Sequence, residues 1–167
     1  NVIIESSRPE GGVMPCWNCP KIQQLTDGRI VMLCEVNDFP PGEWGVEHTA
    51  QVHLWFSDDD GESFTDPVAT SVHGLCPDQI TETADGRWLL PTNLRNPDGH
   101  LVQVISTSQD RGASWSEPEV VYNDAELDEV SIVTLPSGEL VAYERQDSGR
   151  PLQKMISRDA GRTWSGP

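Results

Sequence analysis

Three segments of the chain are copies of one pattern: Ser57-Asp-Asp-Asp-Gly-Glu-Ser-Phe64, Ser108-Gln-Asp-Arg-Gly-Ala-Ser-Trp115 and Ser157-Arg-Asp-Ala-Gly-Arg-Thr-Trp164. We call these segments the boxes. In each box the pattern S-x-D-x-G-x-S/T-F/W ends at an aromatic residue, and a proline follows three residues later. The boxes begin at residues 57, 108 and 157, so they are 51 and 49 residues apart. A repeat of this period is typical of a β-propeller or another repeat array.

Each shared position of the boxes has a structural role. The aspartate accepts hydrogen bonds from the N–H groups of the turn, the glycine adopts a positive φ, and the hydroxyl residue ties down the turn. The aromatic residue fills the gap between neighbouring sheets. We therefore predict structural turns built on Ser57, Asp59, Gly61 and Phe64, on Ser108, Asp110, Gly112 and Trp115, and on Ser157, Asp159, Gly161 and Trp164. A calcium loop beginning at Asp58 is disfavoured, because Ala69 stands where an EF-hand has its glutamate.

A second repeat, of hairpin turns, lies between the boxes at residues 25–29, 83–87 and 135–139. Apolar, β-rich runs flank each turn; another run precedes each box, and a fourth follows the first two boxes. This order predicts an all-β propeller whose blades are four-stranded antiparallel sheets of about 50 residues, with no helix. We divide this single domain into three blades, at residues 1–67, 68–118 and 119–167.

The composition narrows the class of function. The 167 residues include 11 Lys and Arg against 27 Asp and Glu, for a net charge of −16. Because phosphate groups attract basic surfaces, we expect neither nucleic acid nor an anionic membrane as a partner. No apolar run approaches the ~18 residues of a membrane-spanning helix, and no signal peptide is visible, which leaves secreted and cytoplasmic locations open.

The four cysteines, Cys16, Cys19, Cys34 and Cys76, are too few for a disulfide scaffold in a chain of this length. Cys16 and Cys19 form a C-x-x-C pair, which by itself is a weak signal for a metal. A zinc site would need Cys34, Cys76 or a histidine to converge on that pair. We therefore expect reduced thiols, no metal and no cofactor, with zinc as the alternative.

Over essentially the whole chain, the boxes and the strands between them resemble the sialidase (neuraminidase) superfamily, with its Asp-box or BNR repeats. The resemblance implies a six-bladed propeller whose boxes lie on the face opposite the active site. In this chain the site would use the starts of the first strands and the ends of the second strands. The implied activity is that of an exo-glycosidase acting on a terminal, acidic sugar. A non-catalytic glycan-binding propeller and a structural propeller are the alternatives.

Residues 128–145 match in register the superfamily's third-blade motif, N-E-S-x-V-V-x-L-x-D-G-x-L-x-x-N-x-R. The resemblance implies that Glu129 assists the catalytic nucleophile and that Arg145 is one of three arginines binding the substrate carboxylate. A hairpin with a three-residue loop at 136–138 pairs residues whose numbers sum to 274, so Glu129 and Arg145 should face each other. A plain cross-strand ion pair is the alternative.

Six further residues near the same mouth are predicted to bind substrate: Trp17, Asn18, Trp44, His48, Asp78 and Arg95. Asp38 and Asp78 also lie on the face that an acid/base carboxyl needs. Two departures from the superfamily stand out. No arginine occurs at the expected place near Asn18, and no tyrosine occurs at the expected place of the nucleophile, because Tyr122 and Tyr143 fall within strands.

The two ends of the chain are complementary in pattern. Residues 1–5 resemble the strand at 119–123 that follows the second box, whereas no strand follows the third box. We predict a homodimer in which residues 1–5 of each copy complete the last blade of the other, so that two chains close a six-bladed ring. The alternative is a fragment of a longer single-chain propeller.

Overall fold

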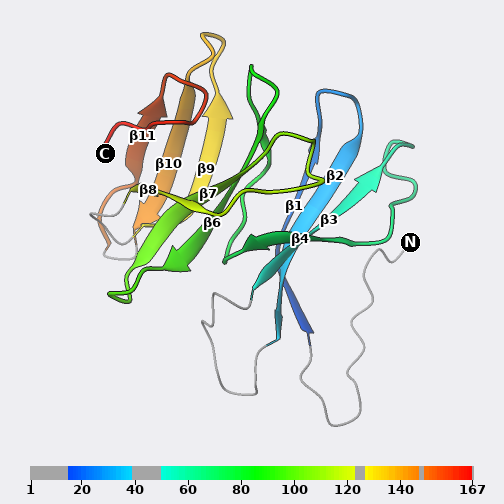
Figure 1. Cartoon of the computed structure of the whole chain (residues 1–167), viewed down its shortest axis with the longest axis horizontal. Helices are drawn as coiled ribbons and strands as arrows, with labels where there is room; N and C mark the ends of the chain where they lie inside the picture. The colour runs from blue at the N-terminus through cyan, green and yellow to red at the C-terminus, as the bar shows by residue number, and fades with distance from the viewer. Residues whose placement is uncertain (1–14, 39–49, 123–126, 147–148, 167) are drawn as a thin grey trace.

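The computed structural model describes residues 15–38, 50–122, 127–146 and 149–166 (Figure 1). In these residues the chain forms strands and turns and no helix, which confirms the all-β, propeller-type fold. Accordingly, no helix of this part has the length and apolar character needed to cross a membrane. The strands form three antiparallel sheets.

The first sheet contains β1 (Pro15–Gln24), β2 (Ile30–Asp38), β3 (Gln51–Ser57) and β4 (Val68–His73). The second contains β5 (Thr81–Glu82), β6 (Trp88–Arg95), β7 (Leu101–Ser108) and β8 (Glu119–Tyr122). The third contains β9 (Leu127–Thr134), β10 (Leu140–Gln146) and β11 (Gln153–Ser157). Within each sheet the strands lie in chain order, which is the meander of a propeller blade.

The sheets place the blade boundaries later than the division at residues 67 and 118. β4 pairs with β3, through Val68 and Leu54, and β8 pairs with β7, through Val120 and Val104. Because the box reverses the chain, the strand after it pairs antiparallel with the strand just completed. The strand that follows a box therefore belongs to the same sheet as the strand that precedes the box. The third sheet has three strands in the described residues, and residues 1–5, predicted to complete it, lie outside them.

Apolar side chains hold neighbouring sheets together. Leu54 of the first sheet shares a buried cluster with Trp88 of the second, and Leu89 of the second shares one with Leu140 of the third. β6 contributes to both clusters because adjacent residues of a strand point to opposite faces of the sheet. Burying one such side chain contributes roughly 1.5–3 kcal/mol to stability.

The boxes form the turns that the sequence predicts. In the second box, Asp110 Oδ1 accepts hydrogen bonds from Ser108 Oγ and Ser114 N, both at 2.8 Å, and Oδ2 accepts one from Ser114 Oγ at 2.6 Å. The bonds from Ser114, with that from Ser108, hold the pKa of Asp110 below its usual range. Gly112 has a φ of 87°, and Arg111 before it also lies in the left-handed region at 57°, which the sequence did not reveal.

The box aromatic and glycine residues face the neighbouring sheet. Trp115 packs against the cluster between the first and second sheets, and Trp164 packs against the cluster between the second and third. Phe64 of the first box is half-buried. A Cβ on Gly112 would lie 3.0 Å from the Trp88 ring, so the close approach of this box to β6 depends on glycine.

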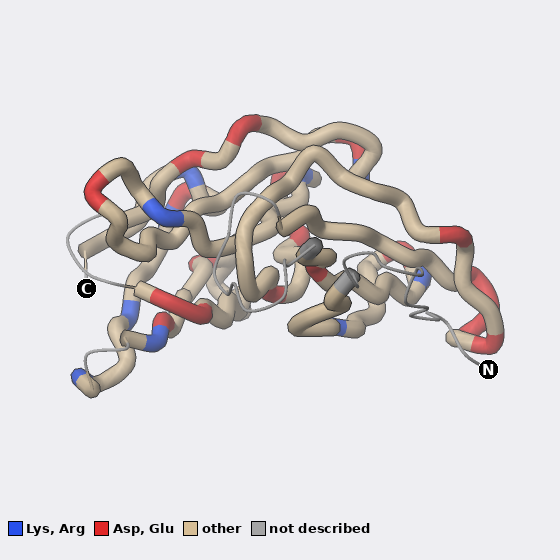
Figure 2. The backbone as a smooth tube through the Cα atoms, turned by 90° about the horizontal axis from the view of Figure 1, so that it is seen from below, with Lys and Arg blue, Asp and Glu red and all other residues tan. Residues whose placement is uncertain are grey.

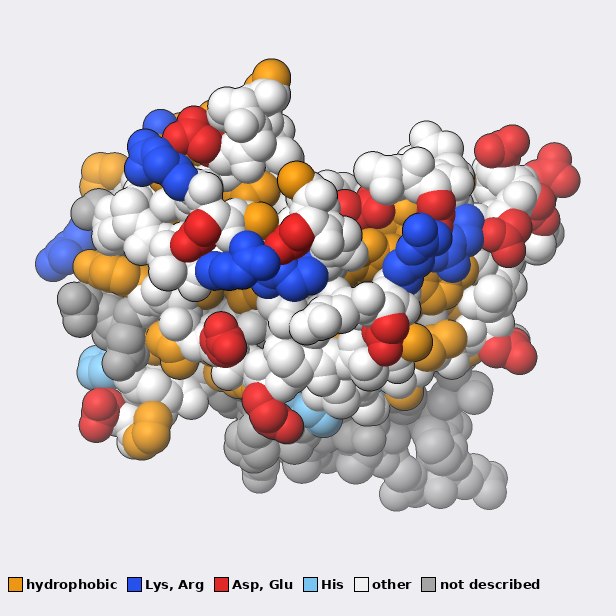
Figure 3. Space-filling model, turned by 45° about the horizontal axis from the view of Figure 1, so that its top comes forward, with side chains coloured by type: hydrophobic (Ala, Val, Ile, Leu, Met, Phe, Trp, Pro, Cys, Tyr) orange, Lys and Arg blue, Asp and Glu red, His pale blue; other side chains and the backbone are white. Residues whose placement is uncertain are grey.

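The boxes and the hairpin turns share one end of the molecule. Arg111 of the second box lies 3.5 Å from Asp27 in the first hairpin turn, and Arg162 of the third box lies 2.5 Å from Asp85 in the second turn. Figure 3, which brings this end forward, shows basic side chains bordered by acidic ones. The starts of the first strands and the ends of the second strands lie at the other end of the antiparallel sheets, as the sequence predicts.

Candidate functional site

A hollow of about 300 Å³ lies at the end away from the boxes. Its walls come from the first sheet through β1, from the third sheet through β9 and β10, and from the connection between β4 and β5. The lining residues are Cys19, Lys21, Cys76, Asp78, Glu129, Val130, Ser131, Arg145 and Leu152. Three of the predicted site residues, Asp78, Glu129 and Arg145, therefore come together here.

Glu129 and Arg145 make the contact that the hairpin register predicts. Arg145 Nη1 donates a hydrogen bond to Glu129 Oε2 at 2.6 Å and lies 3.3 Å from Asp128 Oδ2. The predicted register holds up to the pairing of Glu144 with Val130 and then shifts by one residue, so Arg145 lies at a bulge, a feature that re-aims side chains. The side chains of Arg145 and Glu129 are 51% and 49% exposed, which lets a ligand reach both.

Asp78 belongs to the connection between β4 and β5 and is only 6% exposed. Its Oδ2 accepts a hydrogen bond from the backbone N–H of Ile132 at 3.0 Å, which ties the connection to β9. Burial raises the pKa of Asp78 above its ordinary value. A carboxyl that keeps its proton to higher pH can act as a general acid, although the bond to β9 also has a structural use in joining two sheets.

The same position of the repeat places a polar residue of each sheet near this end of the molecule. Glu35, Asn93 and Arg145 each lie seven residues after the glycine of their hairpin turn, at residues 28, 86 and 138. Asn93 is buried, and its Nδ2 donates to the backbone oxygens of Leu127 at 3.1 Å and Asp128 at 2.6 Å, which holds the start of β9 in place. Sequence reasoning missed Glu35 and Asn93. Aligning the second strands on their hairpin glycines would have found both.

Glu35 lies at the end of β2 and is 0% exposed. Its Oε1 accepts a hydrogen bond from Asn18 Nδ2 at 3.0 Å, whereas its Oε2 has no partner of good geometry among the described residues. Burial raises the pKa of this carboxyl to about 7, against the opposing effect of the Asn18 hydrogen bond. Asn18, predicted to bind substrate, thus holds Glu35 and does not line the hollow.

Two more predicted residues lie away from the hollow. Arg95 lies at the exposed end of β6, two residues beyond Asn93, which is the residue of this strand that faces the site. Its Nη1 donates a hydrogen bond to Gly99 O at 2.9 Å. Trp17 packs edge-on against the rings of His53 and Trp55, at centroid distances of 5.5 and 5.3 Å. Trp17 is therefore a packing residue between β1 and β3.

Trp44 and His48, the last two predicted residues, lie outside the described residues.

A second hollow, of about 260 Å³, lies on the box side of the molecule, between β8 and the third box. Arg87 lines this second hollow, and its Nη2 donates a hydrogen bond to Ala160 O at 2.6 Å. The guanidinium of Arg87 therefore joins the second blade to the third box.

The charge of the candidate site differs from that of the chain as a whole. Figure 2 shows acidic residues along the whole length of the backbone, in keeping with the net charge of −16. The lining of the hollow, in contrast, combines Lys21 and Arg145 with Asp78 and Glu129. An anionic ligand would find basic partners here, and a proton-transfer step would find carboxyl groups.

The sequence profile of the BNR repeat-like domain matches residues 2–167. The chain belongs to this family. The match confirms the BNR repeats that the boxes predict. Among curated proteins, none matches the chain.

Several solved structures share the fold. The Hadza microbial sialidase Hz136 is 21% identical, with a TM-score of 0.69 over 92% of this chain and 33% of that protein. NanB sialidase from Streptococcus pneumoniae is 11% identical, with a TM-score of 0.67 over 99% of this chain and 45% of that one. Zg3597, a family 117 glycoside hydrolase from Zobellia galactanivorans, is 12% identical, with a TM-score of 0.69 over 99% and 49%. The chain thus spans about a third to about half of these structures, and at these identities the likeness describes the fold alone.

Proposed function

We propose that this protein is a sialidase-like glycoside hydrolase that acts on a terminal, acidic sugar. The observation that carries the proposal is the half-exposed Arg145, held 2.6 Å from Glu129 above a hollow that also contains the buried Asp78. Sialidases and a family 117 glycoside hydrolase among the structures with this fold support the general class.

Arg145 is the group that would recognise the sugar carboxylate. A guanidinium carries five N–H donors in a fixed plane, so it can hold Glu129 through one nitrogen and bind a carboxylate through others. Glu129 and Asp128 fix its position before the ligand arrives, which lowers the entropy lost on binding. Lys21 adds a second positive charge to the same hollow.

The carboxyl groups would carry the chemistry. Asp78, with its raised pKa, would give its proton to the leaving oxygen as the glycosidic bond breaks. Glu129 would take a proton from the attacking water, or would assist a tyrosine nucleophile. Tyr122 and Tyr143 lie within β8 and β10, and neither lines the hollow, so water is the nucleophile that the described residues favour.

The test is turnover of a fluorogenic panel containing a sialoside, a uronide, a rhamnoside and a galactoside. We expect turnover of an acidic glycoside and not of the two neutral ones. Arg145→Lys should raise KM about tenfold to a hundredfold, because a hydrogen bond between charged groups is worth roughly 1.5–3 kcal/mol. Asp78→Asn should lower kcat. Arg95→Lys is the matched control and should change neither constant.

A glycan-binding propeller without turnover is the second candidate, because one arginine and no tyrosine line the hollow in the described part of the chain. Glycan-array binding that depends on Arg145, without hydrolysis of any panel member, would favour this candidate. Preference for neutral glycosides, or neither turnover nor binding, would contradict the acidic-sugar proposal.

A further inference from the structure

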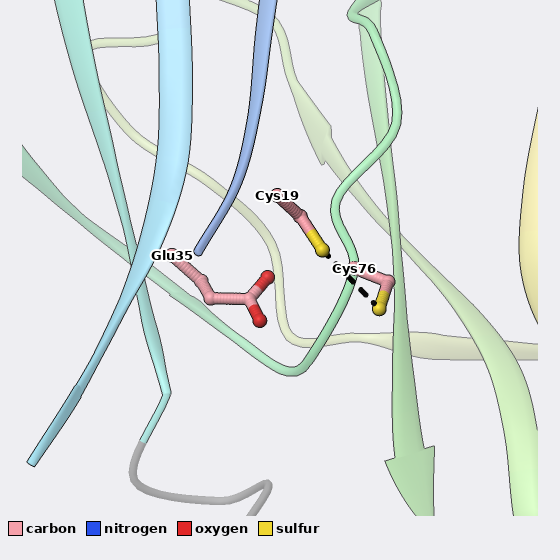
Figure 4. A group of neighbouring side chains, drawn as sticks. All are labelled: Cys19, Glu35 and Cys76. Carbon is pink, nitrogen blue, oxygen red and sulfur yellow. Dashed lines mark hydrogen bonds between the residues drawn. The ribbon is translucent and has the colours of Figure 1, made fainter. Parts of the chain in front are cut away.

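Two thiols and a carboxylate meet at the inner wall of the hollow, from three separate parts of the chain (Figure 4). Cys19 comes from β1, Glu35 from β2, and Cys76 from the connection between β4 and β5. The sulfur atoms of Cys19 and Cys76 lie 3.6 Å apart, and the three ligand atoms all lie within 4.8 Å of one another. From this convergence we infer that Cys19, Cys76 and Glu35 bind a zinc ion.

The spacing suits a tetrahedral ion. Two thiolates bound to zinc at about 2.3 Å, with a tetrahedral angle between them, place their sulfur atoms roughly 3.8 Å apart. The sulfur atoms of Cys19 and Cys76 are already at 3.6 Å, so both can bind one ion with little movement of the backbone. Figure 4 shows the carboxylate of Glu35 directed toward the two sulfur atoms.

Glu35 supplies an independent reason for a cation at this point. Its side chain is 0% exposed, and Oε2 lacks a hydrogen-bond partner of good geometry among the described residues. A buried carboxylate oxygen without a partner is unfavourable, and a bound divalent cation would compensate it. Asn18 Nδ2 donates a hydrogen bond to the other oxygen at 3.0 Å, and such a bond orients a carboxylate that binds a metal.

The backbone also directs both thiols to one place. Cys19 and Cys76 have φ values of 48° and 49°, in the left-handed region that residues other than glycine seldom adopt. At Cys19 this conformation falls where the pairing of β1 with β2 changes register, between Asn18 and Lys21. Residues in such conformations cluster at binding sites, where the surrounding structure holds them.

The identity of the ion follows from the donor atoms. Thiolates favour zinc over magnesium or calcium, which prefer oxygen ligands. Cys19 and Cys76 line the hollow, whereas Glu35 is buried behind them, so three protein ligands leave a fourth coordination position open toward the hollow. That position would share the hollow with Arg145 and is suited to water or to an oxygen of an anionic ligand.

The experiment uses the full chain, reduced with a phosphine and freed of metal, and titrates it with Co²⁺ as a spectroscopic probe. We expect one Co²⁺ ion per chain, a thiolate-to-cobalt charge-transfer band, and displacement of Co²⁺ by Zn²⁺. Cys19→Ser and Cys76→Ser should each abolish the normal band. Cys16→Ser, on the same strand but outside the cluster, is the matched control and should keep it. Glu35→Gln should weaken Co²⁺ binding by roughly tenfold or more while the charge-transfer band remains.

A second measurement needs no variant. Zn²⁺ should slow the alkylation of Cys19 and Cys76 in the wild-type protein and leave that of Cys16 unchanged. Reduced, folded protein that takes up no Co²⁺, or Cys19→Ser and Cys76→Ser variants that bind it as the wild type does, would overturn the inference. So would a Cys19–Cys76 disulfide in the purified protein combined with no metal uptake after reduction. None of these readouts depends on glycoside turnover, so this inference and the proposed function can fail separately.

Discussion

Replacing Glu144 by glutamine is expected to stabilise the protein, by an amount that depends on pH. Glu144 lies on β10 at 0% exposure, and neither of its carboxylate oxygens has a hydrogen-bond partner in the described part of the chain. Burial raises the pKa of this carboxyl from its ordinary 4.5 to about 7. The folded protein therefore keeps the proton at pH values where the unfolded chain has already released it.

A raised carboxyl pKa makes the folded state less favourable as the pH rises. Below a pH of about 4.5 both states carry the proton, and the stabilising contribution of the protonated form is fully present. That contribution is lost as the pH rises through about 7, the pKa of Glu144 in the folded state. Each tenfold difference in proton affinity is worth about 1.4 kcal/mol. The full loss for Glu144 is therefore about 3 kcal/mol.

The measurement is the free energy of unfolding in urea for the wild type and Glu144→Gln, at pH values from about 4 to about 8. Glutamine keeps the size of the side chain but cannot ionise. The variant should match the wild type at about pH 4 and exceed its stability by about 3 kcal/mol at about pH 8. Glu117→Gln, at an exposed glutamate, is the matched control and should show no such trend. A difference between the wild type and Glu144→Gln that is constant with pH, or a variant less stable at pH 8, would refute the reasoning.

Three further predictions concern the boxes, a glycine and the assembly. Asp110→Ala removes three hydrogen bonds from the second box; it should lower Tm without changing the ligand affinity of the folded protein, and unchanged melting with lost binding would contradict a structural role. Gly74→Ala should destabilise by about 2–4 kcal/mol, because its Cβ would lie 2.8 Å from the backbone oxygen of Asn93 at a φ of 131°. Gly99→Ala, at a φ of 85° with no atom within 4 Å of the added Cβ, should lower the free energy of unfolding by only about 1–2 kcal/mol in chemical denaturation. Equal losses for the two variants would show that the close contact with Asn93 does not matter. Light scattering should find a homodimer that dissociates when residues 1–6 are removed, and a stable monomer of the full chain would contradict the predicted ring.

The part of the site that the sequence predicted is the part that depends on local pairing. Glu129 and Arg145 belong to one hairpin, and a turn of known length determines which residues face each other, so their contact followed from counting. Even there the structure added a feature, because the bulge after Glu144 gives Arg145 a second acidic neighbour in Asp128.

The residues that sequence reasoning missed or misplaced depend on contacts between sheets. The sequence analysis made no prediction for Glu35, and packing of the first sheet buries this residue beside Cys19 and Cys76. Arg95 looked like a mouth residue, but the register of β6 brings Asn93 to that position instead. Which strand end is buried depends on how the sheets stack, and spacing along one strand carries no such information.

The sequence by itself determined the all-β propeller fold and the turn at each box. These features repeat within about 50 residues and rest on local hydrogen bonds, side-chain alternation and the conformational freedom of glycine. Only the tertiary structure decided that Asp78 is buried against β9 and that Cys19, Glu35 and Cys76 meet. The physical reason is that burial and proximity between distant segments arise from the packing of whole sheets, in which each contact depends on all the others.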